Sequence, residues 1–234
     1  MIKEYLSIVI PCKNEEFYIL KTLESIQHQN FSNELQIIIA DAQSTDKTRE
    51  LINQFKKTSS LNIKIIEGGP VSYGRNAGAK LVTTDWILFM DADSILFNKN
   101  TLVESVYQTF KGNLLITCKQ QATVKNFKLS IILWIFNLVQ RFMPEAFSTG
   151  VYMMVNRKEF ETLGGFNEEL HQSEDYIFSR QIPKNKFKIL KLTVGQDDRR
   201  YKKIGYFGMI KLVILNWFNR NNLDHFKKDI NYWV

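Results

Sequence analysis

Short apolar runs alternate with longer amphipathic stretches along the first part of the chain. Four apolar runs are too short for ordinary helices and predict buried strands; they cover residues 6–10, 35–40, 61–66 and 86–90. Between them, the spacing of apolar residues predicts helices at about 17–28 and 73–82, and Ser44 or Asp46 is suited to begin a further helix. Strands that alternate with helices indicate parallel βαβ units and therefore an α/β fold.

The second half of the chain is less regular. The pattern predicts three more strands and two more helices; the strands cover 114–123, 149–155 and 187–194, and the helices 126–143 and 173–181. Gly150 would allow a substrate to approach the backbone closely. Residues 206–218 form a helix that is apolar over most of its circumference, so it would pack on the core, form a dimer interface or lie in a membrane surface.

Composition narrows the class of protein. The 234 residues are 44% hydrophobic, enough for one domain with a sizeable core, and the net charge of +7 suits anionic partners such as nucleotide phosphates, acidic lipids or nucleic acid. Cys12 and Cys118 supply neither a disulfide framework nor a zinc-ligand spacing. We expect no signal peptide, and the longest uncharged stretch, 129–140, is shorter than the roughly 20 residues of a spanning helix. These features favour a protein of the cytoplasm or of a membrane face.

Two carboxylates directly follow the fourth predicted strand. Asp91 and Asp93 would lie beyond its carboxyl end, where open α/β sheets bind their ligands. Two hard oxygen ligands suit Mg²⁺ or Mn²⁺, which proteins hold through one or two carboxylates plus substrate phosphates. Taken alone, the Asp-x-Asp pattern equally describes a solvated loop after a strand.

Five short motifs follow one another over about 170 residues. They are Ser7-Ile8-Val9-Ile10-Pro11-x-x-Asn14-Glu15, Asp41-x-x-Ser44-x-Asp46-x-Thr48, Gly74-Arg75-Asn76-x-Gly78, Asp91-x-Asp93, and Gly164-Gly165-Phe166-x-Glu168 followed by Ser173-Glu174-Asp175. In this order they resemble glycosyltransferase family 2, the large inverting family of nucleotide-sugar transferases with the GT-A fold. One departure is visible: where the family often has Asp-Asp-Gly-Ser, this chain has Asp41-Ala42-Gln43-Ser44, which leaves a single carboxylate.

The resemblance implies the architecture. We expect an α/β, GT-A (Rossmann-like) fold with a mostly parallel central sheet, helices on both faces and a C-terminal helical tail. The catalytic domain would span 1–203, with a nucleotide-sugar-binding half at 1–97 and an acceptor half at 98–203. The apolar and basic tail would span 204–234.

The resemblance also implies a donor site. The residues expected to bind the nucleotide sugar are Pro11, Asn14, Glu15, Asp41, Arg75, Asp91, Arg199 and Arg200. Asp93 is the first choice for the metal ligand, with Asp91 sharing the ion or holding the ribose hydroxyls. The donor would be a UDP-sugar or, as the alternative, a GDP-sugar.

Structural interpretations compete with several of these donor-site assignments. Asp41 would otherwise be a helix cap, and Arg75 a surface arginine. Arg199 and Arg200, which could clamp the diphosphate, would otherwise belong to a solvated basic turn.

By the same resemblance, Asp175 is the general base. It opens a predicted helix, where the helix dipole favours an anion, and a carboxylate there can take the proton of an acceptor hydroxyl. Glu174 would orient the loop. The alternative is that Glu174 and Asp175 only cap the helix, and we interpret His171 as an ordinary loop histidine.

The sequence therefore predicts an inverting glycosyltransferase that uses Mn²⁺ or Mg²⁺ and a lipid or glycan acceptor. Peripheral membrane contact and a homodimer remain open. The main alternative is a catalytically silent nucleotide-sugar- or lipid-binding protein on the same fold. A nucleotidyltransferase would need a glycine- and basic-rich loop in place of Pro11-Cys12-Lys13-Asn14-Glu15, and no nucleic-acid recognition motif is present.

Overall fold

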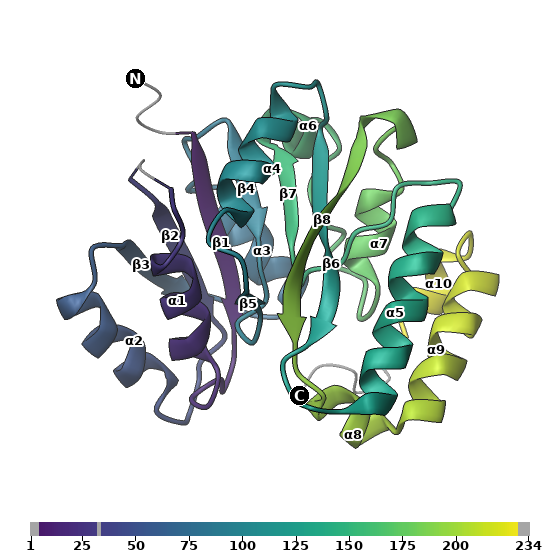
Figure 1. Ribbon diagram of the computed structural model, residues 1–234, viewed down its shortest axis with the longest axis horizontal. Helices are drawn as coiled ribbons and strands as arrows, with labels where there is room; N and C mark the ends of the chain where they lie inside the picture. The colour runs from purple at the N-terminus through teal and green to yellow at the C-terminus, as the bar shows by residue number, and fades with distance from the viewer. Residues whose placement is uncertain (1–4, 32–33, 229–234) are drawn as a thin grey trace.

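One eight-stranded sheet organises the molecule (Figure 1). The computed structural model describes residues 5–31 and 34–228, and the strand order is β3-β2-β1-β4-β7-β6-β8-β5. The strands are β1 (Leu6–Cys12), β2 (Gln36–Asp41), β3 (Asn62–Glu67), β4 (Trp86–Phe89), β5 (Ile95–Leu96), β6 (Leu115–Ala122), β7 (Met153–Asn156) and β8 (Phe187–Gln196).

Strand direction brings the predicted site residues to one edge of the sheet. β3, β2, β1 and β4 are parallel, and the register sets Cys12 opposite Asp41 and Asp41 opposite Glu67. β7 lies antiparallel between β4 and β6, β8 is parallel to β6, and β5 is antiparallel to β8. The sheet is therefore mostly parallel, as predicted, and the loops after β1, β2 and β4 meet at one edge.

Helices cover both faces of the sheet (Figure 1). They are α1 (Ile19–Gln27), α2 (Thr48–Thr58), α3 (Val71–Ala79), α4 (Thr101–Thr109), α5 (Phe127–Phe142), α6 (Arg157–Thr162), α7 (Glu174–Ser179), α8 (Arg199–Ile204), α9 (Tyr206–Phe218) and α10 (Leu223–Phe226). A single 3₁₀ turn, Lys184–Lys186, precedes β8.

The two faces have separate cores, which follow from the alternation of side chains along a strand. In β1, Ile8 and Ile10 belong to the cluster that includes Leu23 of α1. Val9, between them, belongs to the cluster on the other face with Phe160 of α6 and Phe178 of α7. Because β1 and β4 are buried on both faces, their sequences are apolar at nearly every position.

The structure corrects some predicted boundaries. The strand predicted at 149–155 is confined to β7, and residues 149–152 form the loop before it. α3 begins at Val71, directly after Pro70, rather than at about 73. The described part of the tail contains two helices, α9 and α10, and residues 229–234 of that prediction lie outside the described part of the chain. The division into domains stays a prediction.

α5 and α9 pack side by side at one end of the molecule (Figure 1). Leu129 and Leu133 of α5 share a small core with Tyr201 and Met209. Asn137 holds α5 to β6, since its side chain bonds both the N–H and the C=O of Gln120 at 2.8 Å. The outer faces of both helices remain apolar and exposed. Among the described helices, none is long and apolar enough to cross a membrane.

Candidate active site

A cleft of about 790 Å³ lies at the edge where the loops after β1, β2 and β4 meet. Its lining includes six residues predicted for the donor site: Pro11, Glu15, Asp91, Asp93, Arg199 and Arg200. Residues that are distant in the sequence therefore converge here because they follow neighbouring strands, or, for Arg199 and Arg200, begin the helix after β8.

One arginine holds two carboxylates together in this cleft. Nη2 of Arg199 donates to Oδ2 of Asp93 at 2.9 Å and also to the carboxylate of Glu15. Burial raises the pKa of Glu15 to about 7 although Arg199 opposes the shift. Burial and the nearby charge of Asp91 likewise raise the pKa of Asp93. The cleft thus brings acidic and basic side chains together in its lining.

The donor set in this cleft fits a hard divalent cation. Side chains of Asp91 and Asp93 are each 14% exposed, so both can reach a ligand in the cleft. Oε2 of Glu15 is buried without a hydrogen-bond partner among the described residues. Within residues 5–31 and 34–228 there is no group of three or more His, Cys, Asp or Glu side chains arranged around an ion. Mg²⁺ and Mn²⁺ do not need one, because substrate phosphates complete their coordination.

Two predicted donor-site residues are absent from the lining of the cleft. Asp41 is 2% exposed, accepts a hydrogen bond from Oγ of Ser44 at 2.5 Å and forms an ion pair with Nε of Arg49 at 3.2 Å. Asn14 has a left-handed backbone, φ 53°, and its Oδ1 accepts from the N–H of Thr45 at 2.8 Å. Both side chains hold the loops that form the cleft, and their direct contact with a nucleotide stays a prediction.

Arg75 occupies a position that the sequence did not suggest. Its exposed fraction is 0%, so it is not a surface arginine. Its Nη2 donates to Oδ1 of Asp91 at 2.7 Å and its Nη1 to Oε1 of Glu174 at 2.5 Å. Arg75 is absent from the lining of the donor cleft, so this geometry gives no support to a contact with the nucleotide. Instead it connects the Asp-x-Asp loop to α7.

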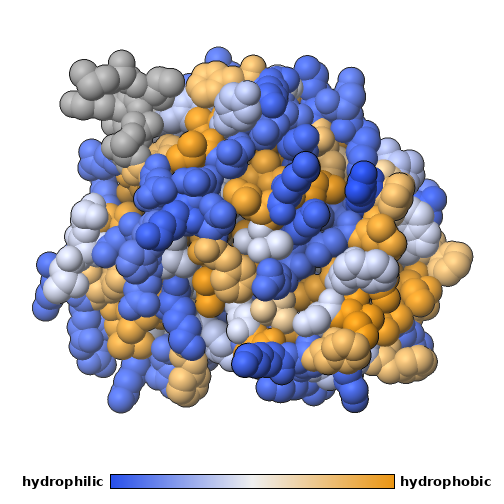
Figure 2. All heavy atoms as spheres, viewed as in Figure 1, coloured by the Kyte–Doolittle hydropathy of each residue, from blue (hydrophilic) through white to orange (hydrophobic). Residues whose placement is uncertain are grey.

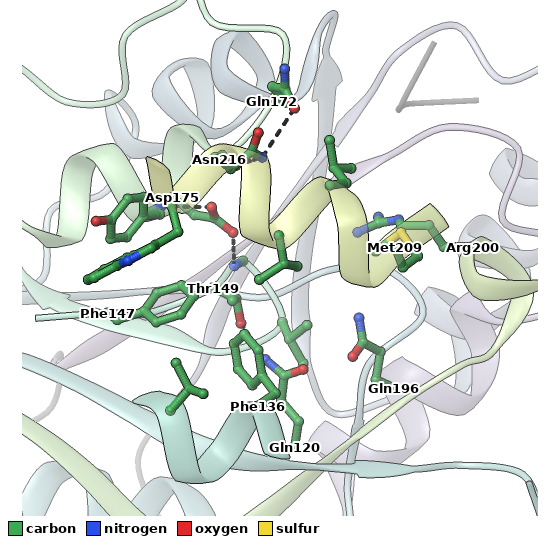
Figure 3. A pocket seen from close by; sticks show the side chains of 18 of the residues that line it. Gln120, Phe136, Phe147, Thr149, Gln172, Asp175, Gln196, Arg200, Met209 and Asn216 are labelled. Atoms are coloured by element: carbon green, nitrogen blue, oxygen red, sulfur yellow. Dashed lines mark hydrogen bonds between the residues drawn. The ribbon is translucent and has the colours of Figure 1, made fainter. Parts of the chain in front are cut away.

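Asp175 opens onto a second cavity of about 460 Å³ (Figure 3). Its Oδ2 accepts the N–H of Gly150 at 2.8 Å and its Oδ1 accepts the N–H of Tyr176 at 2.7 Å. Burial raises the pKa of Asp175, and Arg75 together with these N–H groups opposes the shift. The carboxylate is therefore held in a fixed orientation, with a pKa moved toward the range in which a carboxylate acts as a base.

The two hollows lie next to each other. Asp91 and Arg200 line both the donor cleft and the second cavity. A molecule in one hollow and a molecule in the other would consequently come together beside these two side chains.

Backbone geometry explains two sequence features at this junction. A Cβ atom on Gly150 would lie 1.8 Å from Nη2 of Arg75, so only glycine fits here; the close neighbour is a protein side chain rather than the substrate that the sequence suggested. Ser173 has φ 56°, an uncommon conformation that starts α7 with Glu174 and Asp175 turned inward.

The sequence did not predict several residues that line the two hollows. Gln120 near the end of β6 and Gln196 at the end of β8 line the second cavity. The rule that polar residues at strand ends face the ligand would have identified them. His171, which we interpreted as a loop histidine, lines the donor cleft together with Lys203. No signal in the sequence distinguishes these two residues from ordinary surface positions.

Comparisons with known proteins indicate the family of this chain. The family model described as "Glycosyl transferase family 2" matches residues 7–163, more than half of the chain. TarS of Staphylococcus aureus, a poly(ribitol-phosphate) beta-N-acetylglucosaminyltransferase, is 27% identical over 74% of this chain and 31% of its own length. A Campylobacter jejuni protein named GalNAc(5)-diNAcBac-PP-undecaprenol beta-1,3-glucosyltransferase is 24% identical over 89% of this chain and 74% of its own length. The match to TarS therefore covers about a third of the length of TarS.

Solved structures share the fold. The crystal structure of S. aureus TarS 1-349 in complex with UDP-GlcNAc superposes with a TM-score of 0.65 and 20% identity, over 83% of this chain and 59% of that one. The mannosyltransferase PcManGT from Pyrobaculum calidifontis, in complex with GDP-Man and Mn²⁺, gives a TM-score of 0.68 and 17% identity, over 90% and 64%. Both are glycosyltransferases with the GT-A fold, which this chain shares. From the family match and the shared fold together, the chain belongs to glycosyltransferase family 2.

Proposed function

We propose that this family 2 glycosyltransferase transfers a sugar, with inversion, from a nucleotide-diphosphate sugar to a hydroxyl of a lipid or glycan acceptor. The observation that carries the proposal is the junction of two hollows at Asp91 and Arg200, with Asp175 on one side and Asp93 on the other. A donor in the first hollow and an acceptor in the second would meet there.

The donor would lie in the cleft at the strand ends. Arg199 and Arg200 would bind the diphosphate, since a guanidinium forms bidentate bonds to phosphate. Arg199 would exchange its present partners, Glu15 and Asp93, for the phosphate oxygens. A UDP-sugar is the favoured donor and a GDP-sugar the alternative; the structural relatives hold UDP-GlcNAc and GDP-Man.

Asp93 and Asp91 would hold a divalent cation. When bound, Mn²⁺ or Mg²⁺ neutralises the charge that develops on the departing nucleoside diphosphate. The presence of Mn²⁺ in the PcManGT structure supports this choice, as does the position of both carboxylates in the lining of the cleft.

Asp175 would act as the general base. Its carboxylate accepts the proton of the acceptor hydroxyl while the oxygen attacks the anomeric carbon from the face opposite the diphosphate, which inverts that centre. The N–H groups of Gly150 and Tyr176 hold the carboxylate in place, and Glu174 positions the start of α7 through its ion pair with Arg75.

The enzyme would bind its acceptor at the cytoplasmic face of a membrane. The name of the C. jejuni relative includes an undecaprenol-linked acceptor, which supports a lipid-linked substrate. Exposed apolar residues of α5 and α9 would rest on the lipid surface. If these faces instead joined two copies of the chain, analytical ultracentrifugation would show a dimer that forms with rising concentration.

Thermal unfolding of the protein in the presence of nucleotide sugars tests the proposal. We expect UDP-GlcNAc, UDP-glucose or GDP-mannose to raise the melting temperature more with Mn²⁺ than with EDTA, since a ligand at a hundred times its dissociation constant stabilises by about 2.7 kcal/mol. The Asp93→Ala variant is the control and should lose the part of the shift that depends on Mn²⁺. Identical shifts in wild type and variant would contradict the metal assignment. Binding without any turnover would instead favour a catalytically silent nucleotide-sugar-binding protein.

A further inference from the structure

The cavity beside Asp175 has one apolar and one polar region. Phe136 and Val139 of α5 and Leu212 and Trp217 of α9 contribute apolar walls. The polar lining includes Gln120, Thr149, Gln196 and Arg200, which Figure 3 shows around the same hollow as Asp175. A ligand that matches this cavity has a hydrocarbon part and a small polar part.

The polar region has an unused hydrogen-bond acceptor. Nε2 of Gln120 donates to Oγ1 of Thr149 at 2.7 Å. Oε1 of Gln196, in contrast, is buried without a partner among the described residues. A buried amide oxygen without a partner costs free energy, so a hydroxyl group of a ligand that donates to it would bind favourably.

The apolar region is better suited to a hydrocarbon chain than to a sugar chain. A glycan carries hydroxyl groups on every residue, and the side chains of Phe136, Val139, Leu212 and Trp217 offer them almost no hydrogen-bond partners. A hydrocarbon chain suits these walls, and the cavity volume of about 460 Å³ lies within the range of roughly 300–1,000 Å³ found for small-molecule sites.

The outer faces of α5 and α9 suggest where a hydrocarbon chain would enter the cavity. Large apolar side chains are exposed on α5 and α9; they include Phe127 (80%), Trp134 (65%), Phe142 (72%) and Phe207 (82%). Figure 2 shows hydrophobic surface gathered over the end of the molecule where α5 and α9 lie. Neither helix contains Asp or Glu, whereas Lys128, Arg141 and Lys211 are present. This charge pattern complements an anionic lipid leaflet.

We infer that the cavity between α5 and α9 binds the first part of the hydrocarbon chain of a lipid acceptor, which enters from the leaflet on which the two helices rest. The accepting hydroxyl lies in the polar region and donates its proton to Asp175, while Oε1 of Gln196 accepts a hydrogen bond from a second polar hydrogen of the ligand. This inference rests on the proposed function, because it assigns the acceptor of that reaction. It makes the acceptor a single-chain or isoprenoid-type amphiphile with a hydroxyl at its polar end.

Two pairs of matched variants test the inference. The probe is a fluorescent long-chain alcohol, and its binding is measured by fluorescence anisotropy in the absence of vesicles and of nucleotide sugar. Val139 and Leu138 are neighbours on α5 and each is 43% exposed, but only Val139 lines the cavity. Val139→Trp should weaken binding of the alcohol at least tenfold, while Leu138→Trp leaves it within about twofold of wild type. On α9, Leu212→Trp and Leu215→Trp form the corresponding pair.

The outcomes separate this inference from the proposed function. Nucleotide-sugar binding with Mn²⁺, measured by thermal unfolding, should be equal in all four variants and also reports that each one is folded. If the alcohol does not bind wild type, or binds the variants of each pair equally, the cavity does not hold the chain and the inference is overturned. If the alcohol binds as described but no donor binds, the lipid site stands and the proposed transferase function fails.

Discussion

Arg75 of α3 and Glu174 of α7 form an ion pair in which neither side chain is more than 1% exposed, with 2.5 Å between Nη1 and Oε1. The two residues are 99 positions apart, and the pair joins the N-terminal half of the sheet to the helix that carries Asp175. Asp91 binds the other arm of the same guanidinium. One buried guanidinium therefore connects the Asp-x-Asp loop to the helix that carries Asp175.

Removing the arginine should destabilise the protein strongly. Arg75→Met leaves the buried carboxylate of Glu174 without its cation, and loss of one partner from a buried pair costs about 3–5 kcal/mol. Urea unfolding followed by circular dichroism measures this loss. The double variant Arg75→Met/Glu174→Gln should recover part of it, because the uncompensated charge is gone. The control is Lys227→Met, which breaks the exposed pair with Glu169 and should leave the free energy of unfolding close to that of the wild type. If Arg75→Met and Lys227→Met lowered the free energy of unfolding equally, the result would contradict the buried ion pair.

Gly150→Ala tests the packing against Arg75. The added methyl group would lie 1.8 Å from Nη2 of Arg75 and 3.0 Å from Oδ1 of Asp91, so the guanidinium must move. We expect a loss of about 1–3 kcal/mol from overpacking and, because Gly150 also donates to Asp175, slower sugar transfer. Gly208→Ala in α9 is the control: its new methyl meets only Ile204 at 3.1 Å, and alanine favours a helix. Wild-type stability of Gly150→Ala would show that Arg75 is free to shift.

The parts of the fold that local pattern determines were predictable. The buried strands ending near Pro11, Asp41 and Asp91 follow from apolar runs, and their carboxyl ends meet because parallel strands share one direction. The position of β7 between β4 and β6 depends on pairing between distant segments, which no local pattern specifies. The same holds for the burial of Arg75 and for the cavity beside α9. Both arise from packing between elements far apart in the chain.

Glu15 should make stability depend on pH. Its pKa is raised to about 7 in the folded protein, mainly by burial, above the value of 4.5 for an unperturbed glutamate. Between these two values the folded state binds more protons than the unfolded state, so the free energy of unfolding falls as pH rises from about 4.5 to 7. Glu15→Gln does not titrate and should flatten this slope in urea titrations at several pH values. An unchanged slope would mean that Glu15 remains ionised throughout this range.

The apolar faces of α5 and α9 should bind anionic vesicles. Flotation with phosphatidylglycerol vesicles at low salt should carry the wild type upward, and high salt should weaken the binding because the basic residues contribute. Trp134→Glu combined with Phe207→Glu should abolish flotation, since both side chains are more than 60% exposed on these faces. Tyr107→Glu alters an exposed aromatic residue of α4 and should have no effect. Flotation of the double variant at the wild-type level would place the contact elsewhere.

The rate of sugar transfer by Asp175→Asn tests the central claim most directly. Asparagine keeps the size of the side chain, and its single oxygen can still accept the N–H of either Gly150 or Tyr176, but it cannot take a proton. In a single-turnover assay, the variant should transfer the sugar about 10²–10⁴-fold more slowly than the wild type. Donor binding, measured in parallel, should show near-normal affinity. Glu174→Gln should slow transfer less. Transfer by Asp175→Asn at close to the wild-type rate would contradict the account, and a large loss in Glu174→Gln alone would assign the base to Glu174 instead.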